Sequence, residues 1–358
     1  MARVAFYAPM KPPDHPTPSG DREMARNLMS AISAPGDQVD LISRLRVHDK
    51  TGDAALQQSK RAAADDEAAR LIAEMPADTA IWVTYHNYYK APDLLGPQVC
   101  AARDIPYVQV ESTRASSRLS GPWHAFARAA HQACDAARII FYQTENDRIA
   151  LQRDLNDCQR LVRLDPFLPL SHVPAAANCT GAMVAVGMMR YGDKLASYRV
   201  LADALDLLTG AWHLNIAGDG PARDEVEALF APFGDRVTFL GQLDQSTLRS
   251  VYSRSSVLVW PGVNEAYGMI YLEAQAAGLP VAAQDRPGVR DVLSPADYPT
   301  VDLGARGLAD YLQKLLNDPD YRRKLGRAAQ TYVTDNHLIQ NATTQFWSAV
   351  RPLIEDRV

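Results

Sequence analysis

Two glutamates, Glu265 and Glu273, frame the stretch of this sequence whose residue types are best suited to chemistry. An apolar run over 257–260 predicts a strand, and Gly268 opens an amphipathic helix that continues to Gly278. Glu265 is then expected in the loop between strand and helix, and Glu273 about a turn and a half inside the helix. The two carboxylates therefore flank the amides of a helix N-terminus.

The N-terminus of this predicted helix is suited to bind a phosphate or diphosphate, because its first amides have no carbonyl partners and the helix dipole is positive there. Gly268 would let such a ligand approach closely. A carboxylate repels phosphate, so each glutamate is expected to accept hydrogen bonds from hydroxyls of a sugar or ribose. A solvated loop glutamate and a glutamate placed by the helix dipole would give the same two residues.

The segment from Glu265 to Val281, EAYGMIYLEAQAAGLPV, resembles the E-x7-E signature of family 4 glycosyltransferases, the glycosyl transferases of group 1. The resemblance implies an α/β protein of the GT-B fold, in which two Rossmann-like, doubly wound parallel-sheet domains face across a cleft. It also implies retaining transfer without a metal. It assigns the donor sugar to Glu265 and ribose to Glu273, and it assigns backbone amides for sugar and phosphate to Ala266, Tyr267, Gly268, Met269 and Ile270.

Two further segments resemble the nucleotide side of this family. Gly218 lies in a G-D-G-P turn after a predicted strand, and the next strand ends at Gly241, Gln242 and Leu243. The resemblance places both segments at the donor, with Gln242 near the base. The glycine pair alone is a weak dinucleotide fingerprint, because Pro221 follows it and the third glycine is missing.

Two cations follow the first strand of the predicted second domain. Gly187 is followed by Arg190 and Lys194, which the resemblance assigns to the donor phosphates. In the common pattern the arginine comes directly after the glycine and the lysine precedes a glycine, so both cations are displaced. An ordinary solvated helix entrance would also place two cations four residues apart.

Three residues of the first half are candidates for the same site. Gly20 lies in a proline-rich loop and is the expected point of close approach to the donor, while Asp21 either binds the donor or caps a helix. His86 follows a predicted strand, where the family often has a histidine that reaches the transferred sugar. A structural histidine remains an equal alternative.

The elements that must position these residues alternate between short apolar runs and longer helical patterns, which indicates parallel sheets covered by helices. Segment 164–174 carries three prolines and no helical period, so it is predicted to be a linker. The predicted domains are 1–172, 173–335 and a final segment, 336–358, that returns to the first domain. The predicted strands are 4–8, 39–42, 80–85, 107–110, 139–142, 183–186, 213–217, 237–240, 257–260 and 281–283, and among the predicted helices are 21–32, 195–208 and 223–230.

Bulk composition excludes several partners. The formal charge of −5 over 358 residues gives no general attraction for nucleic acid. The four cysteines form no C-x-x-C pair and suggest no metal site, and no apolar run is long enough for a signal peptide or a membrane span. We therefore expect a cytoplasmic protein with at most peripheral membrane contact, at the inner face of the membrane.

One segment keeps that membrane question open. Residues from Ser112 to Cys134 contain Arg114, Arg118 and Arg128 and no acidic residue, and Trp123 and Phe126 lie between the arginines. This basic stretch could contact an acceptor or a membrane surface. A helix face that pairs with acids elsewhere would give the same pattern.

The sequence thus predicts a retaining, metal-independent hexosyltransferase that moves a sugar from a UDP- or GDP-sugar to a hydroxyl of a glycan, lipid-linked or small-molecule acceptor. No cofactor besides the donor is expected, and the predicted catalytic residues are Arg190, Lys194, Glu265 and His86. The alternatives are a nucleotide-sugar epimerase of the same fold and a nucleotide-sugar-binding protein that has lost catalysis. A nicotinamide dehydrogenase is disfavoured, because no complete G-x-G-x-x-G follows the first strand.

Overall fold

The structure is a computed structural model that describes residues 1–17, 19–33 and 36–355. The chain forms two compact units. Unit 1 consists of Met1–Asp165 and Ile339–Val358, and unit 2 consists of Pro166–Leu338. The last residues of the predicted final segment, 356–358, lie outside the described residues.

Unit 1 is built on one parallel sheet with the strand order β2-β1-β3-β4-β5-β6. The order reverses between β1 and β3, so a crevice at the carboxyl ends of these strands is the expected ligand position in such a sheet. The strands are mostly apolar and buried, as strands covered on both faces must be. They are β1 (Arg3–Tyr7), β2 (Gln38–Leu41), β3 (Thr79–Tyr85), β4 (Tyr107–Val110), β5 (Ile139–Tyr142) and β6 (Arg160–Arg163).

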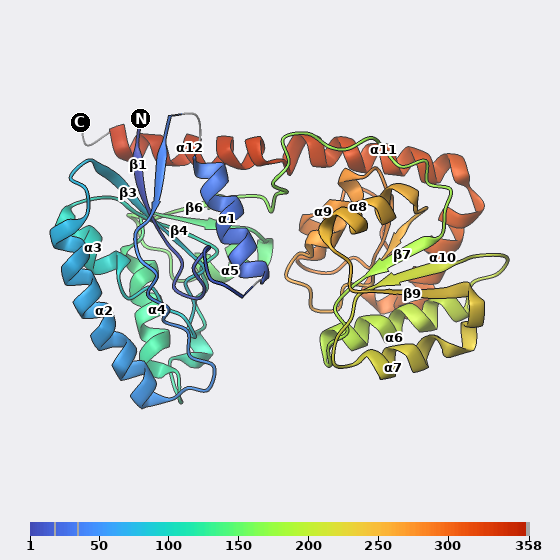
Figure 1. Cartoon of the computed structure of the whole chain (residues 1–358), viewed down its shortest axis with the longest axis horizontal. Coiled ribbons are helices and arrows are strands. Elements are labelled where there is room, and N and C mark those ends of the chain that lie inside the picture. The colour runs from blue at the N-terminus through green and yellow to red at the C-terminus, as the bar shows by residue number, and fades with distance from the viewer. Residues whose placement is uncertain (18, 34–35, 356–358) are drawn as a thin grey trace. The chain divides into compact units, whose positions relative to one another are not determined.

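Helices cover both faces of this sheet (Figure 1), with α2, α3 and α4 on one face and α1 and α12 packed together on the other. Side-chain caps start several of them: Ser19 caps α1, Asp53 caps α2, and Thr144 with Asp147 forms a capping box on α5. The helices of unit 1 are α1 (Gly20–Ile32), α2 (Ala54–Glu74), α3 (Gly96–Arg103), α4 (His124–Ala136), α5 (Glu145–Gln152) and α12 (Ile339–Glu355).

The last helix, α12, joins unit 1 through its apolar face. Phe346 stacks on Phe141 of β5 with ring centroids 5.2 Å apart, and the Trp347 indole N–H donates to the carbonyl of Ile32 at 3.0 Å. These contacts bury two large aromatic side chains, each worth about 2–3 kcal/mol by apolar area. The C-terminal segment therefore belongs to the core of the unit in which the chain begins.

Unit 2 repeats the architecture with five parallel strands in the order β11-β10-β7-β8-β9. Here the order reverses between β10 and β7. In Figure 1, α6 and α7 cover one face of the sheet, and α8 and α9 cover the other. The elements are β7 (Met183–Val186), α6 (Asp193–Asp206), β8 (Leu214–Ala217), α7 (Arg223–Phe230), β9 (Val237–Gly241), α8 (Gln245–Arg254), β10 (Leu258–Val259), α9 (Met269–Ala276), β11 (Val281–Ala282), α10 (Gly304–Asn317) and α11 (Pro319–Asn336).

Two Rossmann-like parallel-sheet domains confirm the predicted fold class. The strand prediction over 257–260 was too long, because only Leu258–Val259 is strand, although Trp260 still donates its amide to Ala282. Strand β6 was not predicted, because this edge strand begins and ends with arginine and so lacks a continuous apolar run. In the part of the chain that the structure describes, no helix has the length and apolar character to cross a membrane.

Candidate functional site

A pocket of about 480 Å³ lies in unit 2 where the strand order reverses. The carboxyl ends of β7 and β8, the segment after β9 and the first residues of α9 meet there. Many of the predicted donor residues line this pocket, together with Val186, Met188, Ala217, Asp219, Gly220, Pro221 and Leu248. Those predicted residues are Gly187, Arg190, Lys194, Gly218, Gln242, Leu243, Glu265, Gly268, Met269 and Ile270.

Glycines bring the backbone turns of this pocket close together. Gly218 has φ +149°, and a Cβ added there would lie 1.9 Å from the carbonyl oxygen of Gly187. Gly268 has φ +80°, and an added Cβ would lie 2.7 Å from the ring of Tyr271. Both positions combine a backbone conformation that favours glycine with a lack of room for a side chain. The pocket floor is therefore made of backbone, which can approach a ligand closely.

Glu265 and Lys194 form an ion pair in the pocket. The Trp260 indole N–H also donates to Glu265 Oε1 at 3.0 Å, and Lys194 Nζ lies 5.6 Å from the centre of the Trp260 ring. Trp260 is fully buried and packs edge-on against Tyr198, so it holds the carboxylate in one place. The charge of Lys194 is thus balanced by the carboxylate that the sequence assigned to the sugar.

The loop before Glu265 is fixed by side chains of α6. Asn264 has φ +49°, a left-handed conformation that asparagine tolerates better than most residues, and its amide donates to Asp193 at 2.9 Å. The amide of Val263 donates to the hydroxyl of Ser197 at 3.0 Å. These two bonds tie the β10–α9 loop to the helix that carries Lys194, so Glu265 and Lys194 are positioned together.

Arg190 lies on the rim of the pocket. Its side chain is exposed and makes no ion pair within the described residues, and its backbone carbonyl accepts from the amide of Leu195 at 3.0 Å. The cation is therefore available to a ligand. Lys194 and Arg190 together give the pocket one balanced and one unbalanced positive charge.

Glu273 faces a different hollow. It lines a neighbouring pocket of about 250 Å³, mainly apolar, which shares Leu248 with the first. The Tyr252 hydroxyl donates to Glu273 Oε2 at 3.2 Å. Burial raises the pKa of Glu273, against the opposing effects of the Tyr252 bond and of Arg249. The structure therefore separates the two glutamates of the signature between two adjoining pockets.

Three other predicted donor residues lie beside the pocket without lining it. Gly241 ends β9, and its carbonyl accepts from the amide of Gly218 at 2.8 Å, which joins the two turns. Tyr267 packs partly buried against the core of unit 2. The carbonyl of Ala266 lies against Gly288, where an added Cβ would come within 2.0 Å of it. These three residues shape the loops that carry the lining residues.

The candidates of the first half meet at the corresponding point of unit 1. His86 follows β3 and Asp21 lies in the first turn of α1, and His86 Nδ1 lies 3.1 Å from Asp21 Oδ1. The N-cap of α1 is Ser19, which corrects the alternative that Asp21 caps this helix. Gly20 stands in open space, since an added Cβ would meet nothing within 4 Å. The histidine and the aspartate therefore form a pair at the switch point of the sheet.

Glu111, which the sequence analysis missed, lies beside this pair. It follows β4, the strand next to β3, and both His86 and Glu111 have positive φ, +64° and +57°. Glu111 Oε2 is buried and accepts no hydrogen bond from the described residues. Residues held in strained backbone conformations cluster at functional sites. Its place directly after a predicted strand was the signal that could have found it.

The pKa values of these groups shift together. Burial lowers the pKa of His86, but Glu111 and Asp21 outweigh burial, so its pKa is raised. The hydrogen bond to His86 lowers the pKa of Asp21. Burial raises the pKa of Glu111. The arrangement favours a protonated His86 between two carboxylates.

The basic stretch from Ser112 to Cys134 is only partly at the surface. Arg114 is buried and pairs with Asp135 at 2.7 Å, whereas Arg118 and Arg128 are exposed. The predicted pairing of the stretch with acids is thus right for Arg114. The two exposed arginines are accessible to an anionic partner.

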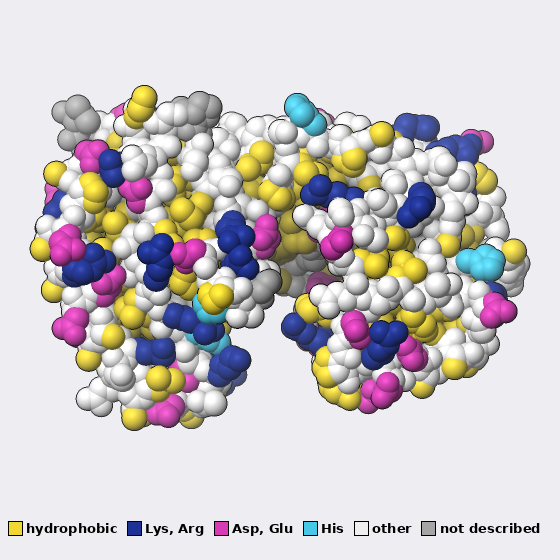
Figure 2. All heavy atoms as spheres, viewed as in Figure 1, with side chains coloured by type: hydrophobic (Ala, Val, Ile, Leu, Met, Phe, Trp, Pro, Cys, Tyr) yellow, Lys and Arg dark blue, Asp and Glu magenta, His cyan; other side chains and the backbone are white. Residues whose placement is uncertain are grey.

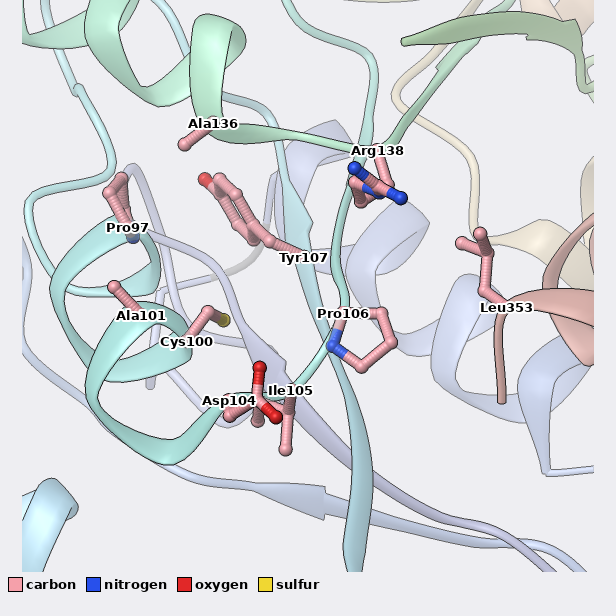
Figure 3. A pocket seen from close by; sticks show the side chains of 10 residues that line it. All are labelled: Pro97, Cys100, Ala101, Asp104, Ile105, Pro106, Tyr107, Ala136, Arg138 and Leu353. Atoms are coloured by element: carbon pink, nitrogen blue, oxygen red, sulfur yellow. The ribbon is translucent and has the colours of Figure 1, made fainter. Parts of the chain in front are cut away.

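A further hollow of about 580 Å³ opens at the opposite edge of the unit 1 sheet. Figure 3 shows Tyr107, which begins β4, and Arg138, which precedes β5, together with Leu353 of α12. The pocket lies at the amino ends of β4 and β5. Ligands of such sheets bind at the carboxyl ends, so this hollow is not the counterpart of the unit 2 pocket.

The sequence of unit 2 matches one known family. Residues 193–332 match the family glycosyl transferases group 1. The matched segment contains Lys194, Gly218 and the Glu265–Glu273 helix, and it begins just after Arg190. Unit 2 therefore resembles this family in sequence over residues 193–332.

Curated relatives match over part of their length. The chain is 30% identical over 159 residues to the sulfoquinovosyl transferase SQD2 of Arabidopsis thaliana, which covers 42% of this chain and 29% of that protein. It is 33% identical over 118 residues to the alpha-D-kanosaminyltransferase of Streptomyces kanamyceticus, covering 32% of this chain and 31% of the relative. The matches thus span less than a third of these relatives.

Solved structures share the whole fold. Sucrose-phosphate synthase from Thermosynechococcus elongatus superposes with a TM-score of 0.74 at 18% identity, over 99% of this chain and 100% of that one. HepE of Anabaena, in complex with UDP and glucose, gives 0.70 at 13% identity over 98% and 100%. Identities this low establish the fold alone, and they confirm the expected GT-B class.

Proposed function

We propose that the chain is a retaining, metal-independent glycosyltransferase that moves a hexose from a UDP- or GDP-sugar to a hydroxyl of a glycan, lipid-linked or small-molecule acceptor. The observation that carries the proposal is the unit 2 pocket, in which Arg190, Lys194, glycine turns and the N-terminus of α9 lie around the carboxylate of Glu265. This set offers positive charge for a diphosphate and a fixed carboxylate for sugar hydroxyls. The match of residues 193–332 to glycosyl transferases group 1 supports it.

In the proposed reaction the donor diphosphate lies against Arg190, Lys194 and the first amides of α9. Negative charge develops on the leaving diphosphate as the bond from the anomeric carbon to the phosphate oxygen breaks, and these groups stabilise it. An approaching phosphate competes with Glu265 for Lys194. The carboxylate of Glu265 then becomes free to accept hydrogen bonds from the sugar.

Retention follows if the acceptor attacks from the face that the diphosphate leaves. The acceptor oxygen bonds to the anomeric carbon, and its proton passes to the departing phosphate oxygen. The sugar passes through an oxocarbenium-like state, so no enzyme carboxylate has to bond to it. Glu265 lines the pocket and is committed to Lys194 and Trp260, which suits a binding role better than a nucleophilic one.

Thermal unfolding with a panel of nucleoside-diphosphate sugars tests the donor assignment. A ligand that binds only the folded state at about 100 times its dissociation constant stabilises by about 2.7 kcal/mol, which raises the midpoint by roughly 5 °C. We expect one UDP- or GDP-sugar to do this, and Arg190→Ala to reduce the shift. Arg199→Ala, which removes an exposed cation of α6, is the matched control. No shift with any member of the panel would overturn the assignment.

Incubation of the best donor without acceptor separates the proposal from its alternatives. A transferase releases free sugar and nucleoside diphosphate slowly by transfer to water. An epimerase returns a changed nucleotide sugar instead, and a protein that only binds leaves the donor intact. Chromatography of the reaction products distinguishes the three results.

A further inference from the structure

Two cations of unit 1 share the same pair of aromatic rings. Lys90 Nζ lies 5.6 Å from the ring centres of both Tyr89 and Trp123, and Arg118 Cζ lies 5.3 and 5.6 Å from the same two centres. The rings are perpendicular, with centroids 5.7 Å apart. Two positive charges therefore lie close together on the rings of Tyr89 and Trp123, which we call the aromatic platform. Aromatic faces attract such cations.

More basic side chains adjoin this platform. Arg46 lies 3.3 Å from His48 Nδ1, and Lys60 Nζ donates to the carbonyl of Arg46 at 2.8 Å. The pKa of His48 is lowered, by burial first and then by Arg46, Lys50 and Lys90. Figure 2 shows Lys and Arg side chains gathered with histidine on this part of unit 1, near the amino ends of α2 and α4. We call the six side chains the basic cluster: Arg46, His48, Lys50, Lys60, Lys90 and Arg118.

The charges of the basic cluster are not balanced by the protein. Among the described residues, none of its lysines or arginines makes an ion pair, although Lys60 and Lys90 are half-buried. The adjoining carboxylate, Asp49, is fully buried and already accepts from the amides of Thr51 and Gly52 and from Gln57. A concentration of positive charge in a chain of net charge −5 attracts anionic ligands.

The platform is also held rigidly. Gln57 donates to the carbonyl of Pro122 at 3.1 Å, and Arg61 donates to that of Ala125 at 2.6 Å, so α2 fixes the segment that carries Trp123. Gly52 packs so closely on this segment that an added Cβ would lie 2.5 Å from Pro122. Rigid side chains lose little entropy when a ligand binds, which favours a binding site over a solvated surface.

An aromatic run connects the platform to the His86–Asp21 pair. The ring of His86 lies 4.7 Å from that of Tyr88, and Tyr88 lies 5.6 Å from Tyr89, which in turn contacts Trp123. The rings thus lead from the switch point of the unit 1 sheet outward to Lys90 and Arg118. A ligand lying on this run would place one end at His86 and the other at the cations.

We propose that the basic cluster and its aromatic platform bind the phosphomonoester of the acceptor, whose ring lies along the aromatic run toward His86. Calling this ligand the acceptor rests on the proposed function. A phosphomonoester carries up to two negative charges and three acceptor oxygens, which match several cations better than a carboxylate does. The tyrosine and tryptophan faces suit the apolar side of a sugar or polyol ring.

Isothermal titration without nucleotide tests this site, with glucose 6-phosphate and glucose as probes. We expect the wild-type chain to bind glucose 6-phosphate and to bind glucose at least tenfold more weakly. The double variant Lys90→Ala/Arg118→Ala should lower the affinity for the phosphate at least tenfold. The matched control is Arg138→Ala/Arg160→Ala, which removes two exposed cations at the amino ends of β5 and β6, at the edge shown in Figure 3.

A second pair of variants excludes binding at the donor pocket. Arg190→Ala/Lys194→Ala should leave the affinity for glucose 6-phosphate within about twofold of wild type. The proposal is overturned if this pair, rather than Lys90→Ala/Arg118→Ala, abolishes binding, or if the control pair weakens binding equally. If no nucleotide sugar shifts the unfolding midpoint while glucose 6-phosphate binds as described, the proposed transfer fails and the phosphate site stands.

A lipid headgroup carries the same phosphomonoester, and vesicles identify that source. Phosphatidylcholine vesicles with and without phosphatidic acid are pelleted with each variant. Pelleting that needs phosphatidic acid and Lys90 with Arg118 supports the site with a lipid source, even where the soluble sugar phosphate does not bind. Absence of binding to both glucose 6-phosphate and phosphatidic acid contradicts the proposal.

Discussion

In unit 2 the cation Lys194 lies against Glu265 at the switch point of the sheet, whereas in unit 1 Lys90 and Arg118 lie on two aromatic rings without a carboxylate partner among the described residues. The two sites also differ in what forms them. Backbone turns without room for a Cβ line the unit 2 pocket, while side chains from four separate segments form the unit 1 surface.

The two proposed anion sites thus hold positive charge in two different ways. A lysine balanced by a carboxylate costs the folded state little. An unbalanced cluster leaves like charges close together, so its binding energy for an anion includes relief of repulsion. We therefore expect responses of different size when matched residues of the two sites are replaced.

The largest effect is expected from closing a backbone turn of unit 2. Gly218→Ala adds a Cβ that would lie 1.9 Å from the carbonyl of Gly187 in a residue at φ +149°. We expect a loss of unfolding free energy of roughly 3 kcal/mol or more, since strain and displacement of β7 add. Denaturant unfolding measures it.

Two glycines serve as controls for that change. Gly210 has φ +77° and open space, so Gly210→Ala should cost only the conformational strain, about 1–2 kcal/mol. Gly20 stands in open space in the first turn of α1, and Gly20→Ala should be neutral within about 0.5 kcal/mol. Equal losses in all three variants would contradict a pocket floor made of tightly packed backbone.

Removing one cation from each site sharpens the contrast in charge. Lys194→Ala leaves the largely buried Glu265 without its ion pair and should cost about 1–3 kcal/mol of unfolding free energy. Lys90→Ala removes a charge that has no such partner and should change stability by less than about 0.5 kcal/mol. The two variants are compared by denaturant unfolding at low and high salt. A larger loss for Lys90→Ala would mean that the basic cluster is balanced after all.

A smaller, pH-dependent effect is expected from the His86–Asp21 pair. Because the pKa of His86 is raised in the folded state, protonation of His86 stabilises the fold fully below the unfolded value near 6.5. This stabilisation is lost as pH rises through the folded pKa. Because the pKa of Asp21 is lowered, its ionised carboxylate stabilises the fold fully above the unfolded value near 3.8. This stabilisation is lost as pH falls through the folded pKa. The pair therefore contributes mainly between about pH 4 and the raised pKa of His86.

Asp21→Asn tests this window. The variant should lower the pKa of His86, followed by NMR titration of its ring, and should be less stable than wild type at pH 5.5. The two proteins should converge as pH rises beyond the pKa of His86. An unchanged His86 titration would show that Glu111 alone sets its charge.

The grouping of the residues that line the unit 2 pocket could be predicted from the sequence because they lie close to strand ends. Gly187 and Gly218 come directly after strands, and Glu265 lies in the loop that follows β10. Parallel strands bring such positions to one edge of a sheet. Glu273 was misleading in this respect, because a helical turn separates it from Glu265 and directs it into the neighbouring pocket. Spacing along the chain predicted the helix, but not which hollow each carboxylate faces.

The unit 1 surface could not be predicted in the same way. Lys90, Arg118 and Trp123 come from loops without a repeating pattern, and only tertiary packing brings them to the residues around Arg46. Arg114 and Arg118 look alike in the sequence, but one is buried against Asp135 and the other is exposed. Glu111 was overlooked because a single carboxylate after a strand has no motif around it.

The turnover of the best nucleotide-sugar donor, measured as nucleoside diphosphate released per second, tests the central claim most directly. We expect Arg190→Ala and Lys194→Ala each to lower this rate about 100-fold, because each removes a group that stabilises the leaving diphosphate in the proposed reaction. Circular dichroism should show both variants folded, and Arg199→Ala should keep the wild-type rate. Wild-type turnover in both Arg190→Ala and Lys194→Ala would contradict the assignment of this pocket to glycosyl transfer.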